Sequence, residues 1–420
     1  MTSSERHEAR YKRRKQKRMH KRELRLAECS FDHMISYNDW IHATVACKHN
    51  VYYKSAVQLY MDHPVMHMYE KINEIKKGNI PFRINTCRII IRERGKERKI
   101  EPIMFEKRIG EHVFCDNIYL PYFKGLMIYD NGASIKGRGT DFARKRILRH
   151  LEKARREYGN EFYAWQFDFK SFFDSIKYYV CEQILKDHFK DERIINFSID
   201  SITEYTKGNI EINLRVNPEV AKQLQQKLES SNGEGICLGS QNSQITALIV
   251  PNELDHFIKD ICRIKYYCRY MDDGIVLHSD KKYLKELWDK CKVICEKLGL
   301  SFNMKKTKIV KISRGFVFLK TKYQVTKDGK ILRRPHRSGI VRNRRRLKRF
   351  MHLVKIGKMS LDDVYNSFQS YYNHTKKIGK SFKTRKQMLK QYVELFDGYK
   401  LDKLLGKHYK RRKPKCCTIK

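Results

Sequence analysis

Two adjacent carboxylates, Asp272 and Asp273, stand between two short apolar runs of the sequence, at residues 266–268 and 275–277. Strand-like runs on both sides of an Asp-Gly pair are typical of a β-hairpin, so we expect the carboxylates at a hairpin tip. Like charges side by side are costly unless a cation neutralises them. Mg²⁺ is a hard cation that carboxylate oxygens hold together with substrate phosphates, so the hairpin predicts a magnesium site. The alternative is a solvated turn in which both aspartates only favour the bend.

A third carboxylate, Asp168, ends another strand-like run further upstream, at residues 162–167. The segment from Asp168 to Ile176 has the pattern D-x-x-x-F-F-D-x-I, and the hairpin has the pattern Y-x-D-D. In order, spacing and neighbouring residues, these two segments resemble the reverse transcriptase family. The resemblance covers about residues 85–400.

The resemblance implies an α+β protein with a right-hand polymerase fold of fingers, palm and thumb. The palm would be a split βαβ sheet and the thumb would have about three helices. We expect a basic helical extension over residues 1–80, fingers and palm over 81–310, a primer-grip hairpin and thumb over 311–400, and a basic tail over 401–420. Apolar spacing predicts the thumb helices near 341–356, 360–376 and 382–396, with a capping box at Ser360 and Asp363.

Nucleotidyl transfer with two metal ions is the chemistry that the resemblance implies. One ion would activate the primer 3′-hydroxyl, and the other would hold the triphosphate. The expected catalytic residues are Asp168, Asp272 and Asp273, and the expected metal ligands are these three and Phe169. Two Mg²⁺ ions are expected, with Mn²⁺ as the alternative.

Six residues are expected at the incoming nucleotide. Phe173 falls where the family places an aromatic gate against the ribose 2′-hydroxyl. Lys306 lies in a segment that resembles the family's L-x-x-N-x-x-K-T-x-I, where the lysine would protonate or screen the leaving pyrophosphate. A hairpin predicted over residues 82–100 resembles the fingertip loop of the family, and its alternative is a solvated charged turn. The expected set is Arg92, Arg98, Phe173, Leu238, Gly239 and Lys306.

The expected contacts with template and primer come from four segments. They are a glycine-rich loop before a helix, the segment after Leu238, the primer-grip hairpin, and a stretch rich in arginine after residue 333. The residues are Lys136, Arg138, Gln241, Ser243, Gln244, Phe318, Leu319, Arg342, Arg345 and Arg346. The pattern L-G-x-x-x-S-Q, where most of the family has Q-G-x-x-x-S-P, resembles the enzymes of diversity-generating retroelements. It also occurs in phage-defence relatives.

The charge balance is extreme, with 90 Lys and Arg against 47 Asp and Glu and a formal net charge of +43. Such an excess repels itself unless a polyanion neutralises it, so we expect a nucleic-acid partner with salt-dependent affinity. An anionic membrane surface is the rival, but no apolar run approaches the ~18 residues of a spanning helix. We expect no membrane partner, a cytoplasmic location for a bacterial or phage-encoded protein, and reduced, buried cysteines.

The predicted function is therefore RNA-directed DNA synthesis, with an RNA template, a DNA or RNA primer and dNTPs as partners. A structured non-coding RNA is also expected, and an accessory protein is left open. A retroelement of the diversity-generating type is the expected setting. Two alternatives remain: a defence enzyme that makes unusual or untemplated DNA, and an RNA-binding protein that keeps a polymerase fold without catalysis.

Overall fold

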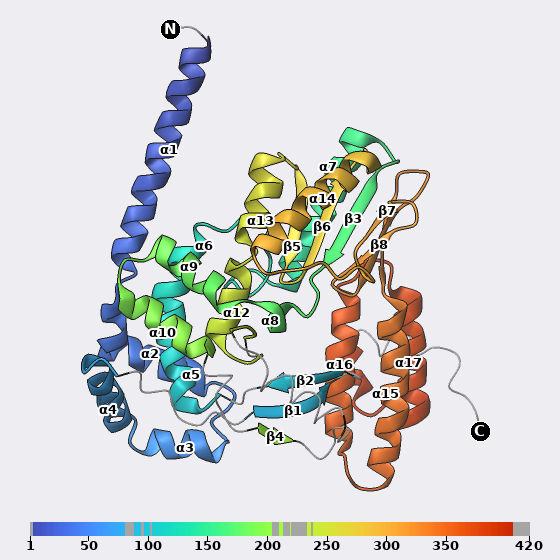
Figure 1. Cartoon of the computed structure of the whole chain (residues 1–420). Helices are drawn as coiled ribbons and strands as arrows, with labels where there is room; N and C mark the ends of the chain where they lie inside the picture. The colour runs from blue at the N-terminus through green and yellow to red at the C-terminus, as the bar shows by residue number, and fades with distance from the viewer. Residues whose placement is uncertain are drawn as a thin grey trace, which may run out of the picture. The chain divides into compact units, whose positions relative to one another are not determined.

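The structure is a computed structural model that describes residues 3–79, 88–93, 96–100, 103–203, 210–212, 219, 233–236 and 238–405. The chain divides into two compact units. Unit 1 comprises Met1–Ile147, Phe167–Val276 and Lys282–Lys308, and unit 2 comprises Leu148–Gln166, Leu277–Lys281 and Ile309–Lys420. Figure 1 shows the elements that are named below.

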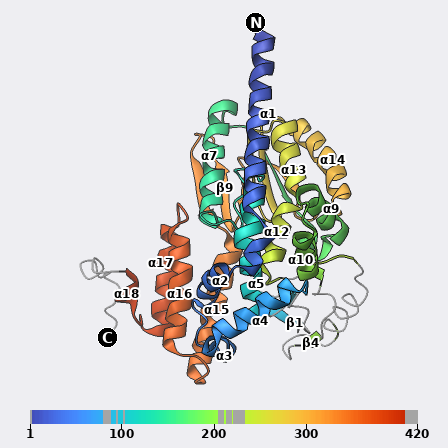
Figure 2. The same ribbon diagram turned by 90° about the vertical axis from the view of Figure 1, so that its left-hand side faces the viewer.

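Unit 1 begins with a long helix, α1 (Ser3–Glu28), which has basic residues along its whole length. Most of α1 stands clear of the other elements of this unit, as Figures 1 and 2 both show. Only its C-terminal end packs, against α6 (Leu120–Lys124). There, Arg22 Nε donates to the Tyr122 hydroxyl at 2.9 Å.

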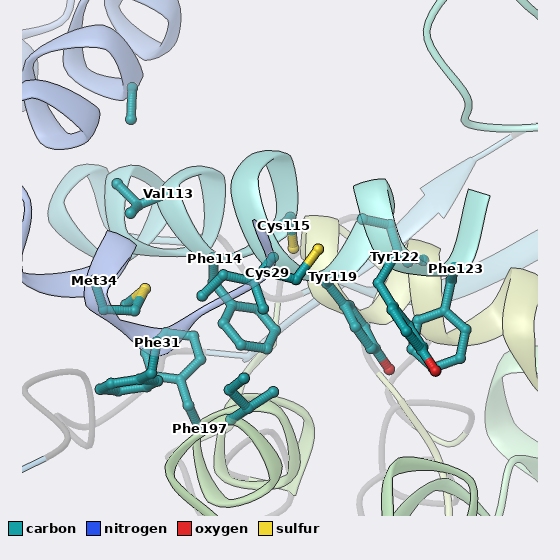
Figure 3. Packing of buried hydrophobic residues seen from close by; sticks show 14 of the residues in the cluster. Cys29, Phe31, Met34, Val113, Phe114, Cys115, Tyr119, Tyr122, Phe123 and Phe197 are labelled. Carbon is teal, nitrogen blue, oxygen red and sulfur yellow. The ribbon is translucent and has the colours of Figure 1, made fainter. Parts of the chain in front are cut away.

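A helical core follows α1 in unit 1. It is built from α2 (Tyr37–Lys48), α3 (Ser55–Asp62), α4 (Pro64–Lys76), α5 (Phe105–Phe114), α9 (Tyr178–His188), α10 (Glu192–Thr203), α12 (Gln241–Ile249) and α13 (Asn252–His256). A short 3₁₀ helix, η1 (Phe31–Ile35), comes before α2, and short π-helical segments, η2 (Cys115–Tyr119) and η4 (Phe257–Ile261), continue α5 and α13. Aromatic side chains fill the core, and Figure 3 shows Phe31, Phe114 and Phe197 packed together. This burial holds η1, α5 and α10 together.

A four-stranded sheet carries the carboxylates, with strand order β5-β6-β3-β7. The strands are β3 (Tyr163–Asp168), β5 (Tyr266–Tyr270), β6 (Asp273–His278) and β7 (Lys308–Lys311). β5 and β6 are buried along nearly their whole length, as expected for strands covered on both faces. Two helices follow the sheet strands in sequence, α8 (Phe172–Ser175) after β3 and α14 (Lys281–Lys297) after β6. The expected hairpin of two strands around Asp272 is confirmed.

The predicted basic hairpin is also confirmed as backbone. β1 (Arg88–Glu93) pairs antiparallel with β2 (Lys96–Ile100), and β4 (Ile210–Ile212) adds a parallel strand to β1. Arg92 lies opposite Glu97, and Arg98 lies opposite Ile91. The side chains of Arg92 and Arg98 fall outside the described part of the chain, so their nucleotide contacts stay a prediction.

Unit 2 contains a small antiparallel sheet of β8 (Phe316–Phe318), β9 (Thr321–Val325) and β10 (Ile331–Pro335). Three longer helices follow, α15 (Arg337–Lys355), α16 (Leu361–Lys376) and α17 (Phe382–Phe396), and then the short α18 (Leu401–Leu405). The three expected thumb helices are therefore confirmed, and so is the capping box of Ser360 and Asp363. Their shared core includes Leu347, Phe368 and Tyr392.

The cysteines behave as predicted where the structure describes them. Cys29, Cys47, Cys115, Cys181, Cys262, Cys268, Cys291 and Cys295 are all free thiols, and all but Cys262 are buried. Among the described residues, no helix combines the length and apolar character needed to cross a membrane.

Candidate active site

The turn between β5 and β6 lies two residues earlier than the Asp-Gly pair predicted. Met271 and Asp272 form the turn, and Asp273 already begins β6. Met271 has a positive φ of 52°, which is unusual for a residue other than glycine. Gly274 lies inside the strand, where an added Cβ would come within 2.1 Å of Phe167 Cζ. This glycine therefore leaves room for the Phe167 ring over β6, and the bend does not depend on it.

Asp168 ends β3 and is only 5% exposed. Lys306 Nζ reaches both carboxylate oxygens of Asp168, at 2.8 and 2.7 Å. Asn303 donates two hydrogen bonds to Asp168. Its backbone N–H donates to the Asp168 carbonyl at 2.7 Å, and its side-chain amide donates to Oδ1 at 3.3 Å. The predicted Lys306 is thus at the centre of the site. Asn303 belongs to the same sequence motif and positions Asp168, a role that we did not predict.

The three aspartates interact with one another at this end of the sheet. Burial and the nearby charges of Asp272 and Asp168 together raise the pKa of Asp273 to about 7. A side-chain hydrogen bond with Asp168 acts in the same direction and raises the pKa of Asp273. Lys306 acts in the opposite direction and lowers the pKa of Asp273.

The same carboxylates supply the hard oxygen ligands that Mg²⁺ or Mn²⁺ prefers, and a divalent ion would remove the repulsion that raises the pKa of Asp273. Their residue types and convergence therefore fit the expected ions. In the described part of the chain, however, no group of three or more His, Cys, Asp or Glu side chains has an arrangement that could hold a metal. Instead, Lys306 forms an ion pair with Asp168. Phe169, the fourth expected ligand, is buried and stacks on Phe302 at 5.7 Å between ring centroids.

A buried ion pair supports the catalytic turn from beneath. Arg269 and Asp255 are both 0% exposed, and Arg269 Nη2 lies 2.7 Å from Asp255 Oδ2. Arg269 Nη1 donates to the Met271 carbonyl at 3.0 Å, and Nη2 also donates to the Leu248 carbonyl at 2.9 Å. Tyr267 donates its hydroxyl to Asp255 at 2.6 Å. Sequence reasoning missed this network, although an arginine inside the apolar run of β5 was a visible signal.

Phe173, the expected gate, lies on α8 five residues after Asp168. The residue before α8, Ser171, has a positive φ of 47°, so the chain turns sharply between the carboxylate and the aromatic pair. Phe173 is half-buried and meets Phe172 edge to face, with ring centroids 5.7 Å apart. Its backbone carbonyl accepts from Ile236 N–H at 2.9 Å, which fixes the position of α8 beside the segment that leads to Leu238.

The segment after Leu238 is held by a buried glutamate on α5. Glu111 accepts hydrogen bonds from Ser240 Oγ at 2.9 Å and from Gln241 N–H at 3.0 Å. Ser240 also caps α12 by accepting from Ser243 N–H. Leu238 and Gly239 stay accessible at the surface of this segment. We did not predict Glu111, because nothing in the sequence marks a lone Glu in a helix as buried.

A cavity of about 570 Å³ opens beside this segment, lined by Gly239, Gln241 and Gln244 together with Arg108 of α5 and Lys54 before α3. Gln241 and Gln244 line this cavity, and their contacts with nucleic acid stay a prediction. The prediction is wrong for Ser243, which is 0% exposed. Its burial follows from the position of α12 in the unit, because every other residue of this helix except Gln241 and Gln244 is buried as well.

The other expected nucleic-acid contacts also differ in accessibility. Lys136 is exposed, whereas Arg138 bonds to the carbonyls of Ile128 and Asn131 and so braces its own loop. In unit 2, the prediction of a direct contact is wrong for Phe318, which is 1% exposed because it faces the small sheet's core.

The tip of the primer-grip hairpin and the basic face of α15 are both accessible in unit 2. Leu319 and Lys320 form the turn between β8 and β9 with positive φ values of 48° and 62°. Arg342 and Arg345 are exposed on α15, and Arg346 is half-buried and donates to Asn343 at 3.0 Å. Arg342 and Arg345 therefore remain the candidates for duplex contacts on this helix.

Comparison with known proteins agrees with this geometry. Residues 121–326, which contain all three aspartates, match the family model described as reverse transcriptase (RNA-dependent DNA polymerase). The chain carries a reverse transcriptase domain. This match and the mixed helix-and-sheet structure give the chain the right-hand polymerase fold that the resemblance implied.

Two solved structures are similar to this chain. One is apo telomerase from Candida tropicalis truncated from the C-terminal domain, at 15% identity and a TM-score of 0.41, covering 59% of this chain and 54% of that one. The other is telomerase from Candida albicans in complex with a TWJ fragment of telomeric RNA, at 13% identity and a TM-score of 0.44, covering 76% and 57%. The chain spans little more than half the length of either telomerase. A search of curated proteins found no significant match.

Proposed function

We propose that this protein is an RNA-directed DNA polymerase, which copies an RNA template into cDNA by extending a primer with dNTPs. The observation that carries the proposal is the meeting of Asp168, Asp272 and Asp273, whose charges act on one another at the end of the sheet. Phosphoryl transfer receives little covalent help from protein, so carboxylates that could bind metal ions at one place are the groups that this chemistry uses. The net charge of +43 supports an RNA partner.

The residues of the site have different roles in this reaction. Asp168, Asp272 and Asp273 would hold two divalent ions, which activate the primer hydroxyl and bind the triphosphate when present. Asn303 orients Asp168 through two hydrogen bonds. Lys306 pairs with Asp168 in this structure and would protonate or screen the leaving pyrophosphate.

The finer proposal concerns the setting. We infer a bacterial or phage retroelement of the diversity-generating type, supported by the L-G-x-x-x-S-Q pattern around Gly239 and Gln244. A defence enzyme that makes unusual or untemplated DNA is the alternative within the same chemistry. Sequencing the nucleic acid that copurifies with the protein, and the DNA that it makes, separates the two, because only retroelement copying gives DNA complementary to one bound RNA.

The test of catalysis is extension of a labelled DNA primer on an RNA template with dNTPs and Mg²⁺. We expect Asp272→Asn to abolish extension, because a neutral amide does not hold the metal pair. RNA affinity should stay within a few-fold, since one carboxylate barely changes the field of a chain with +43 net charge. The matched control is Asp289→Asn on α14, which removes one exposed carboxylate that pairs with Lys292 at 2.7 Å.

Two results would contradict the proposal. If wild-type protein extends no primer on several templates, the RNA-binding alternative without catalysis is favoured. If Asp272→Asn extends primers as fast as Asp289→Asn, the assignment of the carboxylates is wrong.

A further inference from the structure

A second cavity lies in unit 1, between the C-terminal part of α1, the segment that follows α6, and the elements α13 and η4. Its volume is about 800 Å³, and none of the residues that line it belongs to the catalytic centre described above. Lys21, Arg22 and Arg25 line it from α1, and Lys259 lines it from η4. Four cations from elements distant in sequence therefore converge on one concave surface.

The acidic residues of this cavity are already neutralised. Asp130 pairs with Arg146 at 2.5 Å and with Lys259 at 3.0 Å. Asp260 pairs with His256 at 2.6 Å. Among the described residues, no carboxylate lies within ion-pair distance of Lys21 or Arg25. The cavity therefore has an excess of positive charge that an anion would neutralise.

Arg22 and Arg25 of α1 differ in their hydrogen bonds. Arg22 is fixed, because it bonds to the Tyr122 hydroxyl, the Asp187 carbonyl and the His188 ring, all at 3.1 Å or less. Arg25 instead lies against Gly125, where an added Cβ would come within 2.0 Å of its guanidinium, and its buried Nε has no hydrogen-bond partner among the described residues. An anion that drew Arg25 toward the cavity would break no hydrogen bond at that nitrogen.

An exposed aromatic ring stands at the edge of the same cavity. Tyr129 is 60% exposed, and the guanidinium of Arg146 lies 4.8 Å from its ring centroid. Cations beside an exposed aromatic ring are the combination that RNA-binding surfaces offer to phosphates and unstacked bases.

The free part of α1 extends this surface. Lys12, Arg13 and Lys17 are exposed on it, one to three turns before the cavity. A membrane would require a continuous apolar stripe along the helix. Here the exposed apolar side chains, Met19 and Leu24, stand singly among polar ones. The chemistry therefore favours RNA over a lipid surface.

We propose that this cavity, together with the exposed cations of α1, is a second RNA-binding surface that holds a structured part of the RNA outside the catalytic centre. The proposal rests on the proposed function in so far as the RNA held here is the one that the polymerase copies or accompanies. Such a site would raise the local concentration of template without touching the reacting atoms.

The experiment compares two variants with a matched control. The first is Lys21→Gln/Arg25→Gln, and the second is Lys21→Gln/Lys259→Gln, which leaves the packing of Arg25 on Gly125 intact. The control is Lys285→Gln/Lys290→Gln, which removes two exposed lysines of α14 and so the same net charge. Full-length proteins are titrated with a labelled stem-loop RNA over a range of salt concentrations, and folding is checked by circular dichroism.

We expect both cavity variants to bind the stem-loop RNA at least about tenfold more weakly than the control at physiological salt. The slope of log affinity against log salt should fall by about 1.4 to 1.8, the loss of two phosphate contacts. Extension of a short primer already annealed to a short RNA template, at saturating concentration, should change less than about twofold.

Equal RNA affinity and equal salt slope in the cavity variants and the control would overturn the proposal. So would a loss of binding to phosphatidylserine vesicles in the cavity variants with RNA affinity unchanged. Both results are independent of catalysis, because the binding assay contains no dNTPs. A wild-type protein that fails to polymerise would contradict the proposed function and leave this test intact.

Discussion

The buried pair of Arg269 and Asp255 offers a sharp test of how the catalytic turn is held. The guanidinium makes five hydrogen bonds of 2.7 to 3.0 Å, three to Asp255 and one each to the carbonyls of Leu248 and Met271. Removing one partner of a buried ion pair leaves the other charge uncompensated, at a cost of about 3–5 kcal/mol. We expect Arg269→Met and Asp255→Leu each to lower the free energy of unfolding by that amount.

The combined variant Tyr267→Phe/Asp255→Leu/Arg269→Met separates stability from catalysis. It removes both charges and the hydroxyl that donates to Asp255, and replaces them with apolar side chains. Such replacements are often neutral for stability. The carbonyls of Leu248 and Met271 still lose their donor, so we expect the free energy of unfolding to return to within about 2 kcal/mol of wild type.

The combined variant should regain stability but not the rate of catalysis, because no group in it donates a hydrogen bond to the Met271 carbonyl. Loss of that charge-assisted hydrogen bond, worth about 1.5–3 kcal/mol, lets the turn with its positive φ relax away from Asp168. We expect kcat to fall about 10- to 100-fold. Urea unfolding gives the stability, and primer extension at saturating substrate gives kcat. If the combined variant regains both, Arg269 supports only the fold and its role at the turn is refuted.

Three further outcomes are expected. Phe173→Val should admit ribonucleotides, since a smaller side chain opens the gate position; primer extension with rNTPs measures this, and unchanged discrimination would place the gate elsewhere. Leu238→Gln should lower the error rate several-fold on a defined RNA template, because a glutamine amide can add an orienting hydrogen bond of about 1 kcal/mol, and equal error spectra would exclude a fidelity role. The pKa of Asp273 is raised from 3.8 to about 7, so the metal-free protein should lose stability as the pH rises through that window. Mg²⁺ should therefore raise Tm more at about pH 8 than at about pH 5, and Asp273→Asn should remove the difference.

Most of the fold could be predicted from periodic patterns in the sequence. The thumb helices, the capping box at Ser360 and the two strands around Asp272 depend on local spacing and on short-range hydrogen bonds, which a sequence displays directly. The site aspartates and Lys306 were recognisable because their spacing belongs to a family pattern.

What could not be predicted depends on which way a side chain faces after packing. Ser243 and Phe318 were expected to contact nucleic acid, yet both are buried, because their motifs do not reveal which face of α12 or β8 turns inward. Arg269 and Glu111 were missed for the converse reason. A charged residue is assigned to the surface by default, and only the tertiary structure supplies the partners that make its burial tolerable.

The contact between Gly274 and Phe167 has a consequence for the backbone that carries the carboxylates. Phe167 comes directly before Asp168, and Gly274 comes directly after Asp273. With no Cβ at position 274, the Phe167 ring lies against the backbone of β6, the neighbouring strand of the same sheet. Backbone hydrogen bonds hold adjacent strands about 4.8 Å apart, so a larger residue at 274 would displace the ring and leave the strands paired. Because the ring belongs to the residue before Asp168, its displacement would disturb that carboxylate. Positions 167 and 274 should therefore change only together, a large ring with glycine or a small side chain with alanine.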